Sequence, residues 1–240
     1  LFTAGSSLMI SGEVAVDVPW LSVEYRRILS VEAKVEFDAA DQPVIASLAR
    51  QGRQPGFTLV EESVASPGCG LSFVDRNGIT RAEWSIRNAH GHQELYYRAD
   101  MMSDPYSKAI PSEVPSIEKQ IEKEPIATAM TQILDRAKER SADAFTLTRE
   151  IMKEFDNQEQ NAQLLRNHKG RAHLIVDMLN QADIPARVVR ALKLEDGRRR
   201  QQLIDYVQVF EDDKYDLFDP QTGLQGRPEH LMLWEYNSQP

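Results

Sequence analysis

The sequence lacks several features that would assign it to a protein class directly. It has a single cysteine, Cys69, among 240 residues, so no disulfide can form within the chain. No apolar run reaches about 18 residues, the length that a membrane-spanning helix needs, and no signal peptide is recognisable. Lys and Arg number 28 against 37 Asp and Glu, a net charge of −9. The acidic balance argues against nucleic-acid binding through a general basic field.

The remaining composition is that of a folded globular chain. Hydrophobic residues make up 41% and charged residues 27% of the sequence, which is ordinary for such proteins. The length predicts one large or two small domains. Because the chain begins at Leu1 without methionine, we expect a fragment or a processed product, from which flanking membrane segments could have been cut. No motif predicts a cofactor.

The N-terminal part of the sequence has the alternation of β-strands. Apolar residues at 31, 33, 35 and 37 alternate with charged residues at 32, 34 and 36, which is the period of a half-buried strand. Asn77-Gly78 is a strong hairpin signal, and residues 79–87 and 93–102 are predicted to pair around a turn at His90-Gly91. Strands at this spacing predict a β-sandwich over 1–104. For residues 1–29 the pattern fits a strand in part and a tail in part.

The C-terminal part reads as helices followed by strands. A proline-containing linker is predicted at 105–117, before a second domain at 118–240. Helices are predicted at 116–140 with an interruption at Pro125, at 144–155, and from about 161 to 182; strands are predicted at 184–194, 202–210, 215–218 and 231–236. Helices followed by antiparallel strands indicate an α+β domain. The predicted fold class is therefore α+β, with the β-sandwich first.

Three blocks of this second domain have the order used by papain-like cysteine enzymes. In that chemistry a thiolate at a helix start attacks a carbonyl carbon, a histidine on a strand moves the proton, and a carboxylate orients the histidine. The blocks are Asp183-Ile184-Pro185-Ala186-Arg187, Ile204-Asp205-Tyr206-Val207-Gln208-Val209-Phe210, and Leu217-Phe218-Asp219-Pro220-Gln221-Thr222. They resemble the Gly-Ile-Pro-Ala-Arg, His-Ala-Trp-Val-Glu-Val-Tyr and Asp-Pro-Thr segments of the transglutaminase-like family.

Two of the three catalytic positions have lost their chemistry. The resemblance places the family's cysteine at His168 and its histidine at Ile204, and it retains the aspartate as Asp219. An imidazole does not replace a thiolate at a helix N-terminus, because the dipole there disfavours its cation. Isoleucine cannot move a proton. We therefore expect a pseudoenzyme without catalytic residues.

The combination resembles the inactive transglutaminase-like domains that are fused to seven transmembrane helices in bacteria, and residues 31–37 and 93–98 resemble strands of that family. The resemblance implies a soluble fragment of an inner-membrane protein, on the periplasmic side. It implies the transmembrane helices of the same full-length protein as partners, together with ATP-grasp ligase-like and aspartic-protease-like proteins of the same system. The function it favours is a binding or sensory module, with a peptide or protein in a cleft lined by His168, Tyr206 and Asp219.

Two other functions stay open. One is a metal-dependent peptidase that uses His168 and Asp219, although His173 faces another side of the helix and Asp205 should point to the opposite face of the strand from Ile204. The other is a structural scaffold of an envelope complex. Asp219 is equally well explained as a turn residue.

Three further residue groups favour structural roles. His90 and His92 flank Gly91, and such a pair can bind a metal, but an exposed tight turn is the commoner use. Arg187 favours a structural pairing over a ligand contact. Cys69 lies between two glycines, where nothing indicates a nucleophile.

Overall fold

The computed structural model describes residues 5–11, 28–50, 56–65, 68–76, 79–104, 114–157, 160–166, 168–194, 202–212, 214–228 and 231–236. The chain divides into two compact units, which we call the first and the second unit. The first unit comprises Leu1–Pro111, Leu192–Leu203 and His230–Trp234, and the second comprises Ser112–Ala191, Ile204–Glu229 and Glu235–Pro240. The boundaries expected from composition stay predictions, and most of the expected linker lies outside the described residues.

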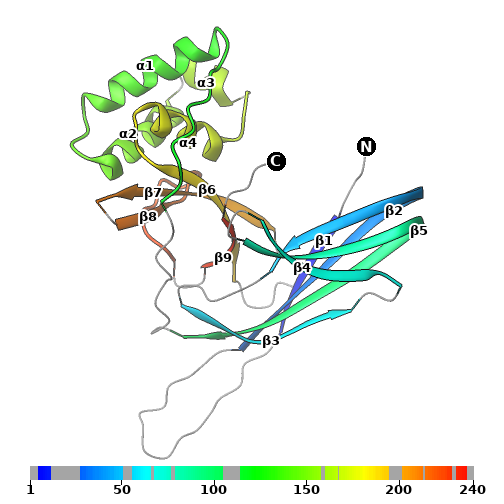
Figure 1. The fold of residues 1–240 in the computed structure, drawn as a ribbon. Coiled ribbons are helices and arrows are strands. Elements are labelled where there is room, and N and C mark those ends of the chain that lie inside the picture. Colours follow the sequence, from blue (N-terminus) through cyan, green and yellow to red (C-terminus); the bar gives the residue numbers. More distant parts are fainter. Residues whose placement is uncertain are drawn as a thin grey trace, which may run out of the picture. The chain divides into compact units, whose positions relative to one another are not determined.

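The first unit contains an antiparallel sheet built on two very long strands (Figure 1). Its strands are β1 (Gly5–Ser11), β2 (Ile28–Ala49), β3 (Phe57–Ala65), β4 (Gly70–Arg76) and β5 (Ile79–Ser103). β2 and β5 pair from Ile28 opposite Met102 to Ala49 opposite Arg81. The strand order is β1-β2-β5-β3, and β4 also pairs with β5. Among the described residues these strands form one sheet, so the predicted sandwich is not confirmed.

β5 shares one of its edges between two short strands. β3 pairs with its C-terminal half, with Phe57 opposite Ser103. β4 pairs with its N-terminal half and places Arg76 opposite Ile79. That last pair confirms the predicted hairpin, although Asn77 and Gly78 themselves lie outside the described residues.

The predicted chain reversal at His90-Gly91 is wrong, because β5 runs straight through it. Gly91 has a φ of 66° and lies opposite Ala39. The register shifts between Ala40 and Gln42, beside Asp41 at a φ of 47°. The positive φ values are thus taken up in a β-bulge, which bends and twists the paired strands without ending them. A second register shift, between Gln42 and Val44, is part of the same irregularity.

The two faces of this sheet differ in burial. One face supplies the core of the first unit, whose largest fully buried members are Trp84, Leu95, Tyr97 and Met101. Leu192, Met232 and Trp234 complete this core, and the ring of Trp234 meets Tyr97 edge-on at 6.4 Å. The opposite face of β2 and β5 carries charged side chains, because side chains alternate along a strand.

The second unit has helices first and strands after, as expected of an α+β domain. Its helices are α1 (Ile126–Lys138), α2 (Ala144–Asp156), α3 (Gln160–Arg166) and α4 (Arg171–Gln181). The strands that follow along the chain are β6 (Ala186–Lys193), β7 (Leu203–Glu211), β8 (Lys214–Phe218) and β9 (Leu231–Tyr236), in the sheet order β8-β7-β6-β9. Most of β9, as far as Trp234, belongs to the first unit. Figure 1 shows α1 to α4 clustered together.

Two helix predictions fail at identifiable residues. Helix α1 begins only after Pro125, and residues 114–123 form no regular element. Proline lacks an N–H and fits the start of a helix better than its interior. The single helix expected from about 161 to 182 is two helices, α3 and α4, and Gly170 is the N-cap of the second. The segment between them contains His168.

A common core holds the helices of the second unit against one face of the strands. Apolar side chains from α1, α2 and α4 pack with Ala186, Val188, Val207, Val209 and Phe218. The carboxylate of Glu154 is buried in this unit: its side chain is 3% exposed and accepts from Arg136 at 2.9 Å and from Arg140 at 3.0 Å. Two guanidinium groups thereby compensate the buried carboxylate, whose burial alone would be costly.

Candidate functional site

His168 lies in the turn between α3 and α4, two positions before the N-cap Gly170. Its side chain is 37% exposed, and Nε2 is 3.1 Å from a carboxylate oxygen of Glu122. Glu122 belongs to the irregular segment 114–123. Among the contacts of the described residues, none joins His168 to Ile204 or Asp219. The position predicted for the nucleophile is therefore occupied by an imidazole that pairs with a carboxylate.

The segment 114–123 runs along α4 in the opposite direction. Lys119 forms an ion pair of 2.6 Å with Asp183, just after α4. The side-chain amide of Asn180 donates to the carbonyl of Glu118 at 3.4 Å. Together with the pair at Glu122, these contacts attach the segment at both ends of the helix. No local pattern predicted this arrangement, because the helix predicted over 116–140 includes most of the segment.

Asp219 uses its carboxylate to close the turn after β8. Oδ1 accepts from the backbone N–H of Gln221 at 2.8 Å, and Oδ2 accepts from the hydroxyl of Thr222 at 2.8 Å. The backbone N–H of Asp219 donates to Leu224 at 2.9 Å. These contacts are ordinary aspartate turn chemistry, so the structural role considered for Asp219 is the one that the geometry supports.

Ile204 and Tyr206 lie on the face of β7 that points away from the helices. Val207 and Val209 belong to the helix-side core, and strand alternation puts the even-numbered residues on the other face. Burial raises the pKa of the Tyr206 phenol, and the negative charge of Asp219 adds to this shift. Val207 is paired with Phe218 on β8. Continuing this antiparallel register by one residue places Tyr206 opposite Asp219. The negative charge of Asp219 acts on the Tyr206 phenol, so these two residues are neighbours, and among the described contacts none joins either of them to His168.

The neighbouring strands support structural roles for the other residues considered. Arg187 Nε donates to the fully buried side-chain oxygen of Gln208 at 2.8 Å, and its guanidinium lies 5.3 Å from the ring centre of Phe210. Asp205 faces Arg190 at 3.6 Å, consistent with its expected place on the face opposite Ile204. Arg187 therefore contributes to packing of the sheet.

The metal-peptidase alternative gains no support from the site. In the described part of the chain, one group of His, Cys, Asp or Glu side chains has the spacing of metal ligands, and it consists of Glu36, His92 and Glu94 in the first unit. His168 and Asp219 have no third ligand among the described residues. His173 lies against the start of its own helix, with Nδ1 3.4 Å from where a Cβ at Gly170 would be.

Comparison with protein families identifies the chain. The family described as inactive transglutaminase fused to 7 transmembrane helices matches residues 13–169, which is more than half of the sequence. The chain belongs to this family. The resemblance inferred from the residues is confirmed, and the domain is an inactive transglutaminase-like one. The match ends before Ile204 and Asp219, so it does not test the triad positions. In the described residues, no helix combines the length and the apolarity needed to cross a membrane.

Solved structures support the fold. A protein from Cytophaga hutchinsonii, provisionally described as a cysteine protease, superposes with a TM-score of 0.58 at 11% identity, covering 99% of this chain and 84% of its own. A protein from Parabacteroides distasonis, provisionally described as a protease, covers 80% of this chain and 63% of its own at 12% identity, but its TM-score of 0.30 is too low to carry an argument. None of the curated proteins matches the sequence. At such low identity the first likeness bears on the fold alone.

Proposed function

We propose that this chain is a non-catalytic binding and sensory module on the periplasmic side of a bacterial inner-membrane protein. Its degenerate transglutaminase cleft, at His168, Tyr206 and Asp219, takes a peptide or protein partner. The supporting observation is that each triad position is inert or already engaged. His168 is paired with Glu122, Ile204 carries no titratable group, and Asp219 holds its own turn.

A triad requires a nucleophile bonded to a base and a base bonded to an orienting group. The described contacts contain neither link. What remains at the start of α4 is an exposed polar pair beside an apolar side chain, because Ile121 next to Glu122 is 97% exposed. A polar pair next to an apolar contact suits a peptide with one apolar and one hydrogen-bonding side chain. A peptide that binds at the start of α4 would contact Glu122 first.

The signal would pass to the transmembrane helices of the same full-length protein. ATP-grasp ligase-like and aspartic-protease-like proteins are proposed as partners within the same system. These partners rest on the family resemblance alone. The rival function is a purely structural scaffold, which predicts that substitutions in the cleft have no effect.

The test is a titration of the ¹⁵N-labelled chain with a pool of random hexapeptides. We expect saturable shifts of the amide signals of His168, Glu122 and Asp219, and no shift at Asp143, which begins α2. His168→Ala should weaken the binding, whereas the control variant His173→Ala, on the helix that follows, should not. The peptides should be recovered uncleaved by mass spectrometry.

Two results would contradict the proposal. Cleavage of the peptides by purified protein would show catalysis. Peptide binding that is absent, or that shifts only residues away from these three, would favour the scaffold.

A further inference from the structure

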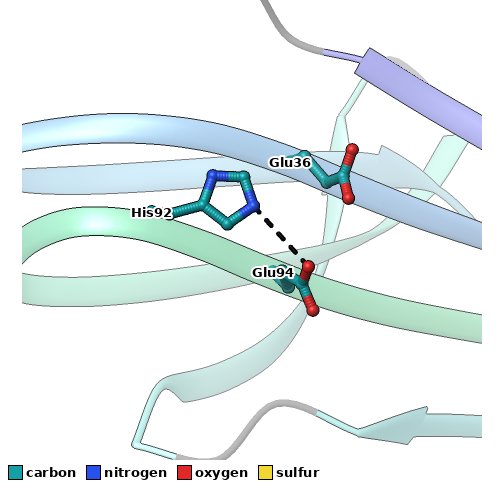
Figure 2. A group of neighbouring side chains, drawn as sticks. All are labelled: Glu36, His92 and Glu94. Atoms are coloured by element: carbon teal, nitrogen blue, oxygen red, sulfur yellow. Dashed lines mark ion pairs between the residues drawn. The ribbon is translucent and has the colours of Figure 1, made fainter.

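A second histidine–carboxylate cluster lies on the charged face of the first unit's sheet. Glu36 on β2 is opposite Glu94 on β5, and Asp38 is opposite His92. His92 and Glu94 are two residues apart and therefore project from the same face. One ligand atom from each of Glu36, His92 and Glu94 lies within 4.8 Å of the other two. Figure 2 shows these three side chains coming from two neighbouring strands.

The ring of His92 is oriented by a further carboxylate. Its Nδ1 is 3.2 Å from Asp38 Oδ1, and its Nε2 is 3.6 Å from Glu94 Oε1, the contact drawn in Figure 2. A carboxylate at Nδ1 favours the tautomer with the proton on that nitrogen. The lone pair of Nε2 then faces Glu94. Histidines that bind metal ions are commonly oriented in this way, by a carboxylate on the nitrogen remote from the metal.

The two glutamates already attract a cation. Lys34 forms ion pairs with Glu36 and, at 2.6 Å, with Glu94. The hydroxyl of Tyr96 donates to the other carboxylate oxygen of Glu94 at 2.6 Å. In the described contacts the Lys34 ammonium pairs with both carboxylates but not with the imidazole of His92.

We propose that Glu36, His92 and Glu94 form a surface site for a divalent transition-metal ion of the zinc class, which Asp38 supports and for which Lys34 competes. Imidazole nitrogen and carboxylate oxygen are both ligands that zinc accepts. Magnesium and calcium prefer oxygen ligands throughout. The bound ion would link β2 to β5 beside their bulge.

This site differs from the His-x-His pair considered from the sequence, for which a turn was favoured and no metal was expected. His90 faces Asp41, with Nδ1 2.7 Å from Oδ1, and it is not a member of the three-residue group. The site also does not depend on the function proposed for the second unit.

The test is calorimetric titration of the chain with zinc chloride, with magnesium chloride as the control ion. We expect one saturable zinc site per chain and a higher melting temperature with zinc, because an ion that binds only the folded state stabilises it. His92→Ala should abolish the site, and Asp38→Asn should weaken it about tenfold. His90→Ala is the matched control on the same strand and should leave zinc affinity within about twofold, because its partner is Asp41 and not the ion.

Lys34→Met provides the opposite change. Removal of the competing ammonium should tighten zinc binding, since both glutamates then become available to the ion. Circular dichroism establishes that each exposed variant remains folded. The proposal is overturned by zinc binding that does not saturate in either the original chain or Lys34→Met. It is overturned equally by binding that survives His92→Ala or is lost in His90→Ala.

Discussion

The two units each expose a histidine beside a carboxylate, but they hold it in different ways. His92 stands on paired strands, and its two ring nitrogens face Asp38 and Glu94. His168 stands in a turn and faces Glu122 from a segment without regular structure. Cross-strand register fixes the separation of several side chains at once, whereas a turn fixes one. The three candidate ligands therefore converge on the sheet and not in the turn, since sites built on rigid elements are better defined than sites on loops.

The largest expected effect separates these two histidines directly. His92→Ala should eliminate saturable zinc binding, while His168→Ala should leave it unchanged, because only His92 is grouped with two further ligands. Calorimetric titration of both variants under identical conditions measures this. Equal losses in the two variants would break the comparison and show that zinc binds nonspecifically to exposed imidazoles.

The next effect compares a buried carboxylate of the second unit with an exposed one of the first. Glu154→Ala should destabilise the fold by about 1.5–3 kcal/mol, because the charge-assisted hydrogen bonds from Arg136 and Arg140 to the buried carboxylate are lost. Glu94→Gln should cause little change, since exposed ion pairs contribute little to stability. Urea unfolding curves of both variants test this order. A larger loss in Glu94→Gln would contradict the burial argument.

Two tyrosines, one in each unit, have pKa values that are raised for different reasons. Burial raises the pKa of Tyr206, whereas the hydrogen bond to Glu94 raises that of Tyr96. Glu94→Gln should lower the pKa of Tyr96 toward its usual value and leave Tyr206 unchanged, as followed by ¹³C NMR of labelled tyrosine. A folded-state pKa above the unfolded one stabilises the fold below the unfolded pKa, and this contribution is lost as the pH rises toward the folded pKa.

Stability should accordingly fall as the pH rises above about 10, the unfolded tyrosine value, and Tyr206→Phe should reduce this dependence. Urea unfolding at pH 8 to 11, chosen to bracket that value, measures the slope. An unchanged slope in Tyr206→Phe would mean that the phenol is not desolvated in the folded chain.

The smallest expected effect concerns the triad positions. His168→Cys together with Ile204→His should react with iodoacetamide no faster than His168→Cys alone. The turn places the thiol beside Glu122, two positions before the helix N-cap, and a neighbouring carboxylate disfavours the thiolate. The test is to compare the alkylation rates of the single and double variants. Acceleration by the second substitution would show that positions 168 and 204 still converge.

Local sequence signals predicted much of the chain where one interaction dominates. The strands β6 to β9 lie within two residues or so of their predicted bounds because alternation and turn residues agree there. Helix α2 begins at Asp143, which accepts from the backbone of Thr146 at 2.6 Å, a local cap of the usual kind. The predictions fail where one residue is compatible with two local structures. Gly91 could turn the chain or fit a bulge, and the long pairing with β2 selected the bulge.

The sequence by itself determined the family and, in the second unit, the order of helices and strands. These follow from residue types and their spacing, which are local or ordered properties of the chain. Only the tertiary structure decided which side chains meet. Glu36 and His92 are far apart in sequence, and strand register places them together. Glu122 reaches His168 because its segment folds back along α4. Such contacts depend on register and packing, which no local pattern contains.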